Sequence, residues 1–530
     1  MSINGSVGTC PILGGVERRR RRQRRSRRGV WIALALVTVL AAAFAAAVAL
    51  RSGASLAEDS SALARVDLQL FAGHVEGVRA FAPDGTAIPL TVSHGRLTPR
   101  TRLTPGETVS VRVVVRRPGW SAWALGAERH ERLTVQAPVA HVVDRWPTEP
   151  RIRFDMPVSA VAVGGTRVAP TSAAVAIPTQ KTAGAVNVAV AARSWEKLGP
   201  PMRVTWFPRS AEPVVLADPA PGAELTPLTP IRLTFSKTVS SVLGSDHPRL
   251  SVRQQGRWVK ADSHTLVFQP SGDGAPFDTD ETVSFTTPVR VLGGTTWHVA
   301  GASFLRLQQL LAQEGYLPVT WSGTDVARTK RAEVAAATAA PAGTFSWRYP
   351  NTPRELVALW TPGEPNTITR GAVMMFQHDH GLTVDGIVGP KVWHAAIADA
   401  VAGKLKFGGY SYVYVHRNVP QLLTLWHSGH VVLTSPGNTG VPAAPTALGT
   451  WPVFEHIPVG RMSGRNPDGT RYNDPGIRWI SYFHGGEALH AFNRASFGTP
   501  QSLGCVELPL DQAAKVWPYT PIGTLVTIEN

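Results

Sequence analysis

The sequence predicts a multidomain, mainly β protein: tandem β-sandwiches, a small three-helix module and a β-rich C-terminal domain. A chain of 530 residues is too long for one hydrophobic core. Its 49 Gly and 43 Pro, with only 17% charged residues, favour short strands and tight turns over long helices. Period-two alternation of apolar and polar residues also returns in successive blocks that are separated by turn signals.

The chain begins with a basic segment and then an apolar one. The stretch "ERRRRRQRRSRR", Glu17 to Arg28, contains nine Arg and one Glu, which is half of the formal net charge of +16. Residues 30–50 carry no charge, and as a helix they would span ~30 Å, the thickness of a bilayer's hydrocarbon core. Because Arg-rich flanks stay in the cytoplasm, we expect a cytoplasmic tail at 1–29, a single transmembrane anchor at 30–50 and export of the chain after Arg51. A cleaved signal segment, which would make the protein secreted, is the alternative.

Three blocks of β pattern follow the apolar segment, at 66–139, 140–210 and 213–292. The first contains "ETVSVRVVVRRPGWSAWAL", and Pro/Gly corners such as "PDG" separate its strands. Each block is the size of a small immunoglobulin-like β-sandwich. In the third block, "PGAEL" before "IRLTFSKTVS" resembles bacterial Ig-like wall-protein domains, and this resemblance implies a spacer role.

Helical periodicity appears next. One helix is expected between the N-cap residue Ser303 and Gly315, a second in "RGAVMMFQHDHGL", and a third from Pro390 onward. Residues in these segments resemble the peptidoglycan-binding three-helix module, with 301–402 as its extent and 320–367 as an insertion that could disturb the sugar-binding groove. The matching residues are Leu307, Gln308, Leu311, Gly315, Tyr316, Phe376, Gln377, Gly381, Leu382, Asp385, Gly386, Gly389, Pro390 and Trp393.

The β pattern returns in residues 404–530. The stretches "YSYVYVH", "QLLTLWHSG" and "HVVLTSPG" predict three strands joined by short turns, and "PTALGTWPV" predicts a loop followed by a strand. The polar stretch from Gly460 to Gly476 is rich in Gly, Asn, Asp and Pro. We expect it to form a mobile surface loop or lid.

Cys505 is one of two cysteines, and the other, Cys10, lies in the predicted cytoplasmic tail. Since export separates the two, Cys505 is a buried small hydrophobe, an intermolecular link or a nucleophile. A nucleophilic thiol needs a base, which is usually His. His490 is the first candidate because the Gly/Pro-containing span that follows it can fold back to Cys505, and His484 is a rival. Small residues before the thiol also expose backbone N–H groups that can form an oxyanion hole.

His490, "ASFG" and "SLGCVEL" together are similar to the catalytic signature of the L,D-transpeptidase (YkuD-type) family. "PTALGTWPV" is similar to a strand entry of the same family, and the likeness extends over 404–530. The resemblance implies Cys505 as the acyl-accepting nucleophile and His490 as its base and later proton donor. It implies that Ser502 orients the site and that the N–H groups of Gly504 and Cys505 are oxyanion donors.

The sequence departs from the family pattern at two positions. Leu503 stands where many members have His, and Glu507 stands where members often have Arg. Loss of a cation near the thiolate would raise the pKa of Cys505 and weaken the binding of an anionic stem peptide. Alternatively, Glu507 pairs with Arg478 or Arg494, or receives a cationic acceptor amine.

The resemblance implies a reaction as well. Attack on the carbonyl between an L-centre and a terminal D-residue of a tetrapeptide stem would release D-Ala and pass the acyl group to a diamino acid side chain, cross-linking peptidoglycan. Water as acceptor would make an L,D-carboxypeptidase, and a degenerate domain would leave a non-catalytic wall-binding scaffold. Tyr482, Asn493, Arg494 and Glu507 are expected to contact substrate.

The expected partners are peptidoglycan stem peptides and glycan, the membrane through the N-terminal helix, and β-lactams of the carbapenem type as covalent inhibitors. No nucleic acid, cofactor or metal is expected. We expect the protein at the cell membrane, with its C-terminal part in the cell wall.

Overall fold

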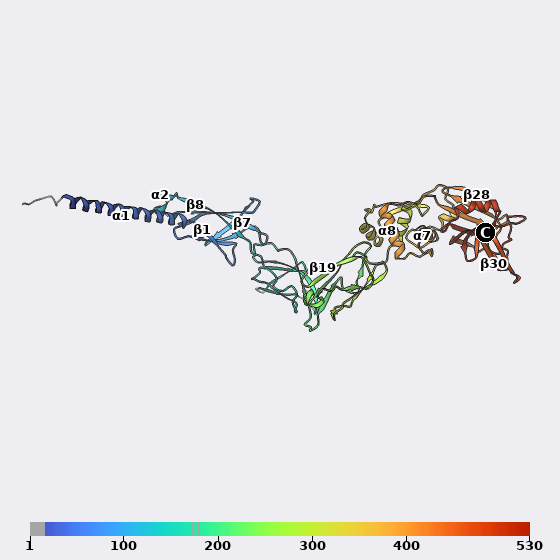
Figure 1. The fold of residues 1–530 in the computed structure, drawn as a ribbon, viewed down its shortest axis with the longest axis horizontal. Coiled ribbons are helices and arrows are strands. Elements are labelled where there is room, and N and C mark those ends of the chain that lie inside the picture. The colour runs from blue at the N-terminus through green and yellow to red at the C-terminus, as the bar shows by residue number, and fades with distance from the viewer. Residues whose placement is uncertain (1–15, 171–172, 178–180) are drawn as a thin grey trace, which may run out of the picture. The chain divides into compact units, whose positions relative to one another are not determined.

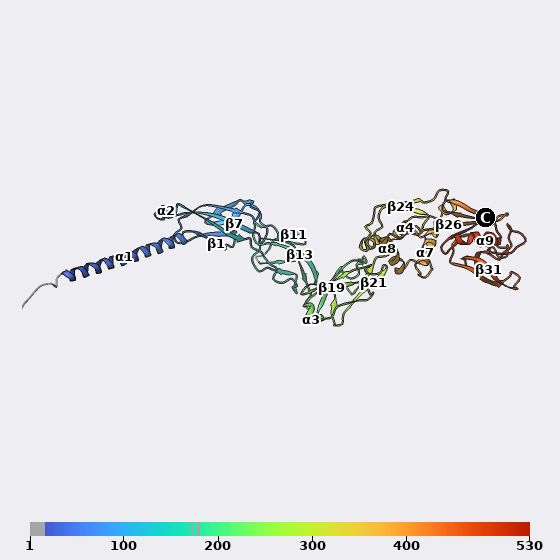
Figure 2. The same cartoon turned by 45° about the horizontal axis from the view of Figure 1, so that its top comes forward.

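The computed structural model describes residues 16–170, 173–177 and 181–530. Cys10 and the first half of the predicted cytoplasmic tail lie outside these residues. The chain forms two compact units, Met1–Arg209 and Ser210–Asn530, whose elements are labelled in Figures 1 and 2. Strands predominate among the described elements, which confirms the predicted mainly β fold class.

The first unit begins with the long helix α1 (Val16–Leu50). Among the described residues, Val30–Leu50 of this helix is the one segment that is long and apolar enough to cross a membrane. The side chains of residues 30–46 are exposed, whereas Val48 is buried.

The first β-sandwich consists of two four-stranded sheets, β1-β2-β6-β5 and β4-β3-β7-β8. Its elements are β1 (Ala54–Ala57), β2 (Ala64–Leu68), β3 (His74–Phe81), β4 (Ala87–Ile88), β5 (Leu90–Ser93), β6 (Arg96–Pro99), β7 (Thr108–Arg116), α2 (Gly119–Leu125) and β8 (Glu128–Gln136). The alternation of β7 turns four valines, Val109 to Val115, into the core, where all are fully buried. The sandwich starts earlier than the expected residue 66, because β1 pairs with β2 at the edge of one sheet.

The second β-sandwich has the sheet β11-β10-β13-β14 and the strand pair β12-β9 among its described residues. Its strands are β9 (Arg151–Arg153), β10 (Ala160–Val163), β11 (Thr166–Val168), β12 (Ala174–Ala176), β13 (Gly184–Ala191) and β14 (Met202–Trp206). Trp195 leaves this sandwich and packs into the core of the first one, where its Nε1 donates a hydrogen bond to Ser61 O over 2.9 Å.

The second unit begins with a third β-sandwich, made of the sheets β19-β20-β17-β15-β22 and β16-β23-β21-β18. Its elements are β15 (Val214–Asp218), β16 (Glu224–Leu225), β17 (Ile231–Phe235), α3 (Val239–Leu243), β18 (Arg249–Leu250), β19 (Gly256–Asp262), β20 (Thr265–Pro270), β21 (Thr279–Ser284), β22 (Arg290–Val291) and β23 (Thr296–Val299). β23 lies beyond the expected end at residue 292, and it carries the fully buried core residue Trp297.

The helical module contains the three expected helices and additional elements within the expected insertion. Its elements are α4 (Phe304–Gln313), β24 (Val319–Gly323), α5 (Lys330–Thr338), β25 (Gly343–Trp347), α6 (Arg354–Val357), α7 (Thr367–Asp379) and α8 (Pro390–Ala402). The Ser303 side chain caps α4, Gly315 follows that helix with a φ of 89°, and Pro390 is the first residue of α8. The insertion is therefore folded, with a β24-β25 hairpin and α5.

The module shares a core with the C-terminal domain. Tyr412, Trp426 and Leu525 belong to the same buried cluster as the helices. The backbones also meet directly, because a Cβ at Gly371 in α7 would lie 2.5 Å from the carbonyl oxygen of Gly523. The buried cluster of the module therefore extends across the expected boundary near residue 403.

The C-terminal domain pairs the sheet β28-β27-β26-β34-β29 with the sheet β30-β31-β32-β33. Its elements are β26 (Ser411–His416), β27 (Leu422–His427), β28 (His430–Pro436), β29 (Gly449–Pro452), β30 (Glu455–Arg465), β31 (Arg471–His484), β32 (Glu487–Ala491), β33 (Val506–Leu508), α9 (Leu510–Val516), a short 3₁₀ helix (Trp517–Tyr519) and β34 (Leu525–Glu529). Apolar side chains from both sheets form a second buried cluster.

The stretch Gly460–Gly476, expected to be a mobile surface loop or lid, is a β-hairpin and not a loop. It forms the outer part of a long antiparallel hairpin between β30 and β31, closed by a turn at residues 466–470. Its residues are polar because the outer part of the hairpin leaves most of its side chains in solvent. The backbone ladder, rather than an apolar face, maintains the hairpin there.

Candidate active site

Two neighbouring strands bring the sequence-predicted residues together. β32 and β33 run parallel, with Leu489 opposite Val506 and His490 opposite Glu507. Leu489 and Val506 face the buried core. Since side chains alternate along a strand, His490, Glu507 and Cys505 share the opposite face. The register of this sheet therefore places the thiol diagonally next to the imidazole.

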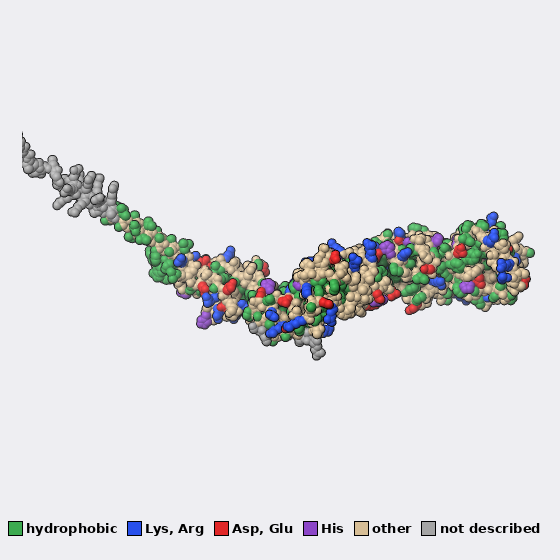
Figure 3. All heavy atoms as spheres, turned by 60° about the horizontal axis from the view of Figure 1, so that its bottom comes forward, with side chains coloured by type: hydrophobic (Ala, Val, Ile, Leu, Met, Phe, Trp, Pro, Cys, Tyr) green, Lys and Arg blue, Asp and Glu red, His purple; other side chains and the backbone are tan. Residues whose placement is uncertain are grey.

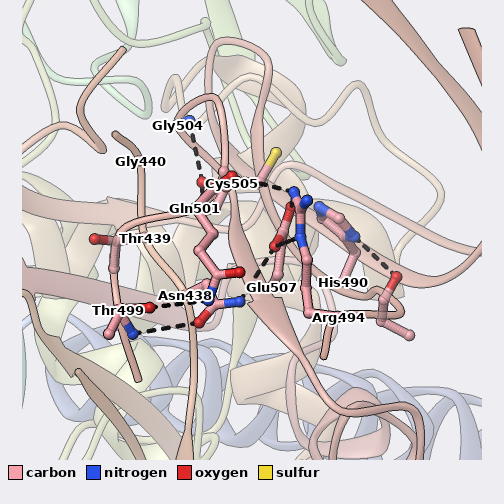
Figure 4. Close-up of polar contacts among 12 residues, drawn as sticks. Asn438, Thr439, Gly440, His490, Arg494, Thr499, Gln501, Gly504, Cys505 and Glu507 are labelled. Atoms are coloured by element: carbon pink, nitrogen blue, oxygen red, sulfur yellow. Dashed lines mark hydrogen bonds and ion pairs between the residues drawn. The ribbon is translucent and has the colours of Figure 1, made fainter. Parts of the chain in front are cut away.

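His490 has the geometry of a general base. It is 3% exposed, and its Nδ1 lies 3.0 Å from Ala491 O. A carbonyl only accepts hydrogen bonds, so Nδ1 carries the proton and Nε2 keeps its lone pair. Figure 4 shows this second ring nitrogen directed toward the side of Cys505. Burial lowers the pKa of His490, and this keeps the imidazole neutral and able to accept a proton.

Cys505 is a protonated thiol at neutral pH. Burial raises the pKa of Cys505 to about 11, the nearby carboxylates of Glu507 and Glu487 act in the same direction, and the Ala488 backbone hydrogen bond opposes them. The thiol hydrogen bond goes to Gly486 O, at a distance of 3.7 Å. No described hydrogen bond joins the sulfur to His490 in the resting site. Such bonds are often loose before substrate binds.

Ser502 organises the loop that carries the thiol. Its hydroxyl donates to Cys505 O over 2.5 Å and accepts from the Gly504 N–H over 3.2 Å. Gly504 has a φ of 110°, a region that favours glycine. In this arrangement the Gly504 N–H, one of the two expected oxyanion donors, is engaged by Ser502. No described residue accepts from the Cys505 N–H, which leaves that donor available to a substrate oxygen.

Two adjacent buried residues, Asn438 and Thr439, also support this loop, and sequence reasoning missed them. Asn438 is fully buried, and its Oδ1 accepts from the Gly498 N–H over 3.0 Å. The neighbouring Thr439 O accepts from the N–H groups of Gln501 and Ser502 over 2.9 and 3.1 Å. Figure 4 shows these residues beside the thiol loop. The only sequence signal was "GNTG" directly after a strand, a pattern that any turn could have produced.

Glu507 is buried and forms an ion pair with the partly exposed Arg494. The guanidinium Nε and Nη2 donate to the two carboxylate oxygens over 2.8 and 2.7 Å, and Glu507 is 4% exposed. This bidentate pair selects Arg494 over Arg478, the other candidate partner. Arg494 therefore supplies a cation close to the position where the family often has Arg. These two residues, both expected to contact substrate, contact each other.

His484, the rival base, is engaged elsewhere. Its Nδ1 lies 3.2 Å from Glu487 Oε2, and its ring packs on Trp451 with centroids 4.1 Å apart. Glu487 also accepts from the Ala447 N–H over 3.1 Å. Among the described contacts, none joins the ring of His484 or of His490 to the Cys505 sulfur. His490 is the better placed of the two, because the strand register puts it on the face that carries Cys505.

Two tyrosines lie near the sulfur. Tyr482 pairs with Ala488 in the register of β31 and β32, on the face that carries Cys505. Burial, followed by the charge of a Cys505 thiolate, raises the pKa of Tyr482 and of Tyr472. Tyr472 lies in the hairpin that was expected to be a loop, so its proximity could not be predicted.

A cavity of about 690 Å³ borders the end of β32. Asn493 lines it together with Asp474 and Arg478 from β31. Asn493 is therefore placed beside a space large enough for part of a peptide. Within the described residues, no group of three or more His, Cys, Asp and Glu side chains is arranged to hold a metal ion.

Comparison with known protein families agrees with this geometry. Residues 410–528 match the profile of the YkuD family, the L,D-transpeptidase catalytic domain. Residues 362–395, which include α7 and the start of α8, match the profile of a peptidoglycan-binding domain. A comparison with curated protein sequences finds no match.

Solved structures similar to this chain include three L,D-transpeptidases. One from Mycobacterium smegmatis is 14% identical and covers 60% of this chain and 99% of its own, with a TM-score of 0.21. The catalytic domain from E. faecium is 22% identical and covers 23% and 99%, with a TM-score of 0.21. L,D-transpeptidase 3 from Mycobacterium tuberculosis, with a faropenem-derived adduct, is 11% identical and covers 59% and 97%, with a TM-score of 0.22.

The thiol loop and the histidine lie within the first of the two matched regions. The chain thus carries an L,D-transpeptidase catalytic domain of the YkuD family at residues 410–528, preceded by a peptidoglycan-binding domain at 362–395.

Proposed function

We propose that this protein cross-links peptidoglycan through a Cys505 acyl-enzyme. The sulfur attacks the carbonyl between the L-centre and the terminal D-residue of a tetrapeptide stem, as the thiol proton passes to His490 Nε2. The tetrahedral intermediate collapses, the C–N bond breaks, and the imidazolium returns its proton to the departing D-Ala amine. A diamino acid side-chain amine of a second stem then attacks the thioester and releases Cys505.

One observation supports this proposal above the others. A neutral imidazole, with Nδ1 on Ala491 O and Nε2 toward the thiol, lies on the same strand face as Cys505. A protonated thiol beside a neutral base is a pair in which proton transfer accompanies attack, so no resting thiolate–imidazolium pair is needed. The unoccupied Cys505 N–H is the donor that can stabilise the developing oxyanion.

Acylation by a carbapenem tests the nucleophile and the base directly. Intact-protein mass spectrometry of the wild type should show one adduct, with the mass of the intact drug or a fragment of it. Cys505→Ala should show none, and His490→Ala should form it at least ~100-fold more slowly, since general-base catalysis contributes 10²–10⁴-fold. His484→Ala is the matched control and should retain most of the wild-type rate.

The same experiment separates the enzyme from a scaffold. Absence of an adduct on the folded wild type would favour a non-catalytic wall-binding protein. An adduct that persists in Cys505→Ala would overturn the residue assignment. Incubation of muropeptides with a labelled diamino acid then distinguishes amine from water as the acceptor: incorporation of label identifies a transpeptidase, and D-Ala release alone identifies a carboxypeptidase.

We also propose that the chain is exported and anchored by Val30–Leu50, with the catalytic domain in the cell wall. The Arg-rich segment before this helix supports an N-terminus in the cytoplasm. The core shared by the helical module and the catalytic domain supports the presentation of bound wall polymer close to Cys505.

A further inference from the structure

The apolar helix does not end in a flexible linker. Val48 in its last turn is 2% exposed. Arg129 in β8 donates from Nη1 to the carbonyl oxygens of Ala49 and Leu50, which lie in the last turn of the helix and have no backbone partner within it. The Phe71 N–H donates to Arg51 O over 2.9 Å. The first β-sandwich therefore packs against the end of α1 and is hydrogen-bonded to it.

An aromatic cluster continues this contact deeper along the helix. Phe44 of α1 lies with its ring centroid 5.9 Å from Phe71 and 6.4 Å from Trp120, and the last two are 6.3 Å apart. Both ribbon views show α2, which carries Trp120, alongside the C-terminal part of α1 (Figures 1 and 2). The sandwich thus extends back along the helix.

The position of Phe44 sets the depth of this cluster. It precedes Leu50 by six residues, which is about 9 Å along a helix axis. If Val30–Leu50 fills the hydrocarbon core, Phe44 lies below the outer boundary of that core. Phe71 and Trp120 touch it from the side, so they lie at membrane depth as well.

The surface around the cluster is suited to lipid. Trp123 is 85% exposed, Leu70 76% and Trp120 54%, and α2 ("GWSAWAL") carries no charge. Arg117 satisfies the carbonyl oxygens at the end of α2, donating to Leu125 O over 2.6 Å. Figure 3 shows hydrophobic side chains covering the drawn face of the apolar helix up to the sandwich. Tryptophan is enriched at the interface between lipid and water.

We propose that the first β-sandwich is seated in the outer leaflet of the bilayer through Leu70, Trp120 and Trp123, beside an uncleaved anchor. The occupant of this apolar patch is lipid, because the patch is continuous with the membrane-spanning helix and shares the depth of Phe44. Arg51, exposed just beyond the span, lies at the level of the phosphates. This contact with lipid fixes the orientation of the first sandwich relative to the membrane. It rests on the anchor proposed for Val30–Leu50 and is independent of the catalytic proposal.

Site-specific fluorescence quenching tests this contact with lipid in the full-length chain. A single cysteine is placed at the patch (Trp123→Cys) or at the far end of β7 (Thr108→Cys) in a Cys10→Ser, Cys505→Ser background. Thr108 is exposed and, at ~3.3 Å per residue, about 26 Å along the strand from Arg116, which makes it the matched control. Both are labelled with NBD and reconstituted in vesicles of phosphatidylcholine and phosphatidylglycerol.

Lipids that carry a doxyl group near the glycerol should quench the label at 123 by about twofold or more and leave the label at 108 unchanged, as expected for a residue at the lipid interface. Aqueous iodide should give the reverse pattern. Equal iodide quenching at both positions would overturn the proposed contact with lipid. Protection of position 123 from both quenchers would also overturn it, since it would show that protein covers the patch.

Discussion

Replacement of Arg494 by Ala should destabilise the catalytic domain strongly. The structure gives Glu507 two charged hydrogen bonds from Arg494, of 2.8 and 2.7 Å, in a position where the residue is 4% exposed. Its third neighbour, the Asn438 amide, is 3.5 Å away and cannot replace them. A buried carboxylate without a partner costs about 3–5 kcal/mol, a large fraction of the stability of a typical domain.

The variant should also alter the base. The negative charge of Glu507 raises the pKa of His490, whereas Arg494 lowers it. Without Arg494, the unopposed carboxylate should raise the pKa of the imidazole. The acid limb of the pH profile for the carbapenem acylation rate should then move to higher pH, because a protonated His490 cannot accept the thiol proton.

Urea denaturation and the pH dependence of acylation measure the two effects. Arg478→Ala, which removes an exposed arginine from the same domain, is the control and should change stability by less than about 0.5 kcal/mol. The double variant Arg494→Gln, Glu507→Gln removes both charges and should recover most of the lost stability. A loss below about 1 kcal/mol in Arg494→Ala, or a double variant as unstable as the single one, would refute the reasoning.

Four further predictions concern the reactivity of the thiol, the stability of the fold at high pH, the support of the thiol loop and the shared core. Alkylation of Cys505 by iodoacetamide should still accelerate above pH 9, because burial raises the pKa of this thiol to about 11; a plateau near pH 8.5 would show an unperturbed cysteine. The same raised pKa stabilises the fold below pH ~8.5, and this contribution should be lost as pH rises toward 11, since the unfolded thiol ionises first. Asn438→Ala should leave the Gly498 N–H unpaired, lower the free energy of unfolding by about 1–3 kcal/mol and slow acylation. Unchanged stability with slower acylation would contradict a structural role for Asn438. Gly371→Ala should lower the melting temperature of the module and catalytic domain together, since its Cβ would meet Gly523 O at 2.5 Å, whereas Gly389→Ala, with open space around it, should not.

Local patterns predicted much of the fold. The alternation of β7, the cap at Ser303 and the helix start at Pro390 depend on residues close in sequence, and the structure has all three. The hairpin β30-β31 was missed because backbone pairing between polar residues holds its outer part together. The sequence of that part therefore shows no alternation of apolar and polar residues. The core common to the module and the catalytic domain was missed because its contacts join residues far apart in the sequence, such as Tyr349 with Trp426 and Gly371 with Gly523.

The sequence by itself determined the chemistry that is available: one thiol after the apolar segment, a histidine fifteen positions before it, and small residues around the thiol. The tertiary structure decided how these groups are used. The parallel register of β32 and β33 put His490 and Cys505 on one face, and the folded chain brought Arg494, rather than Arg478, to Glu507. Residue type sets reactivity locally, whereas the pKa of a group, its orientation and its partner depend on neighbours that only the folded chain brings together.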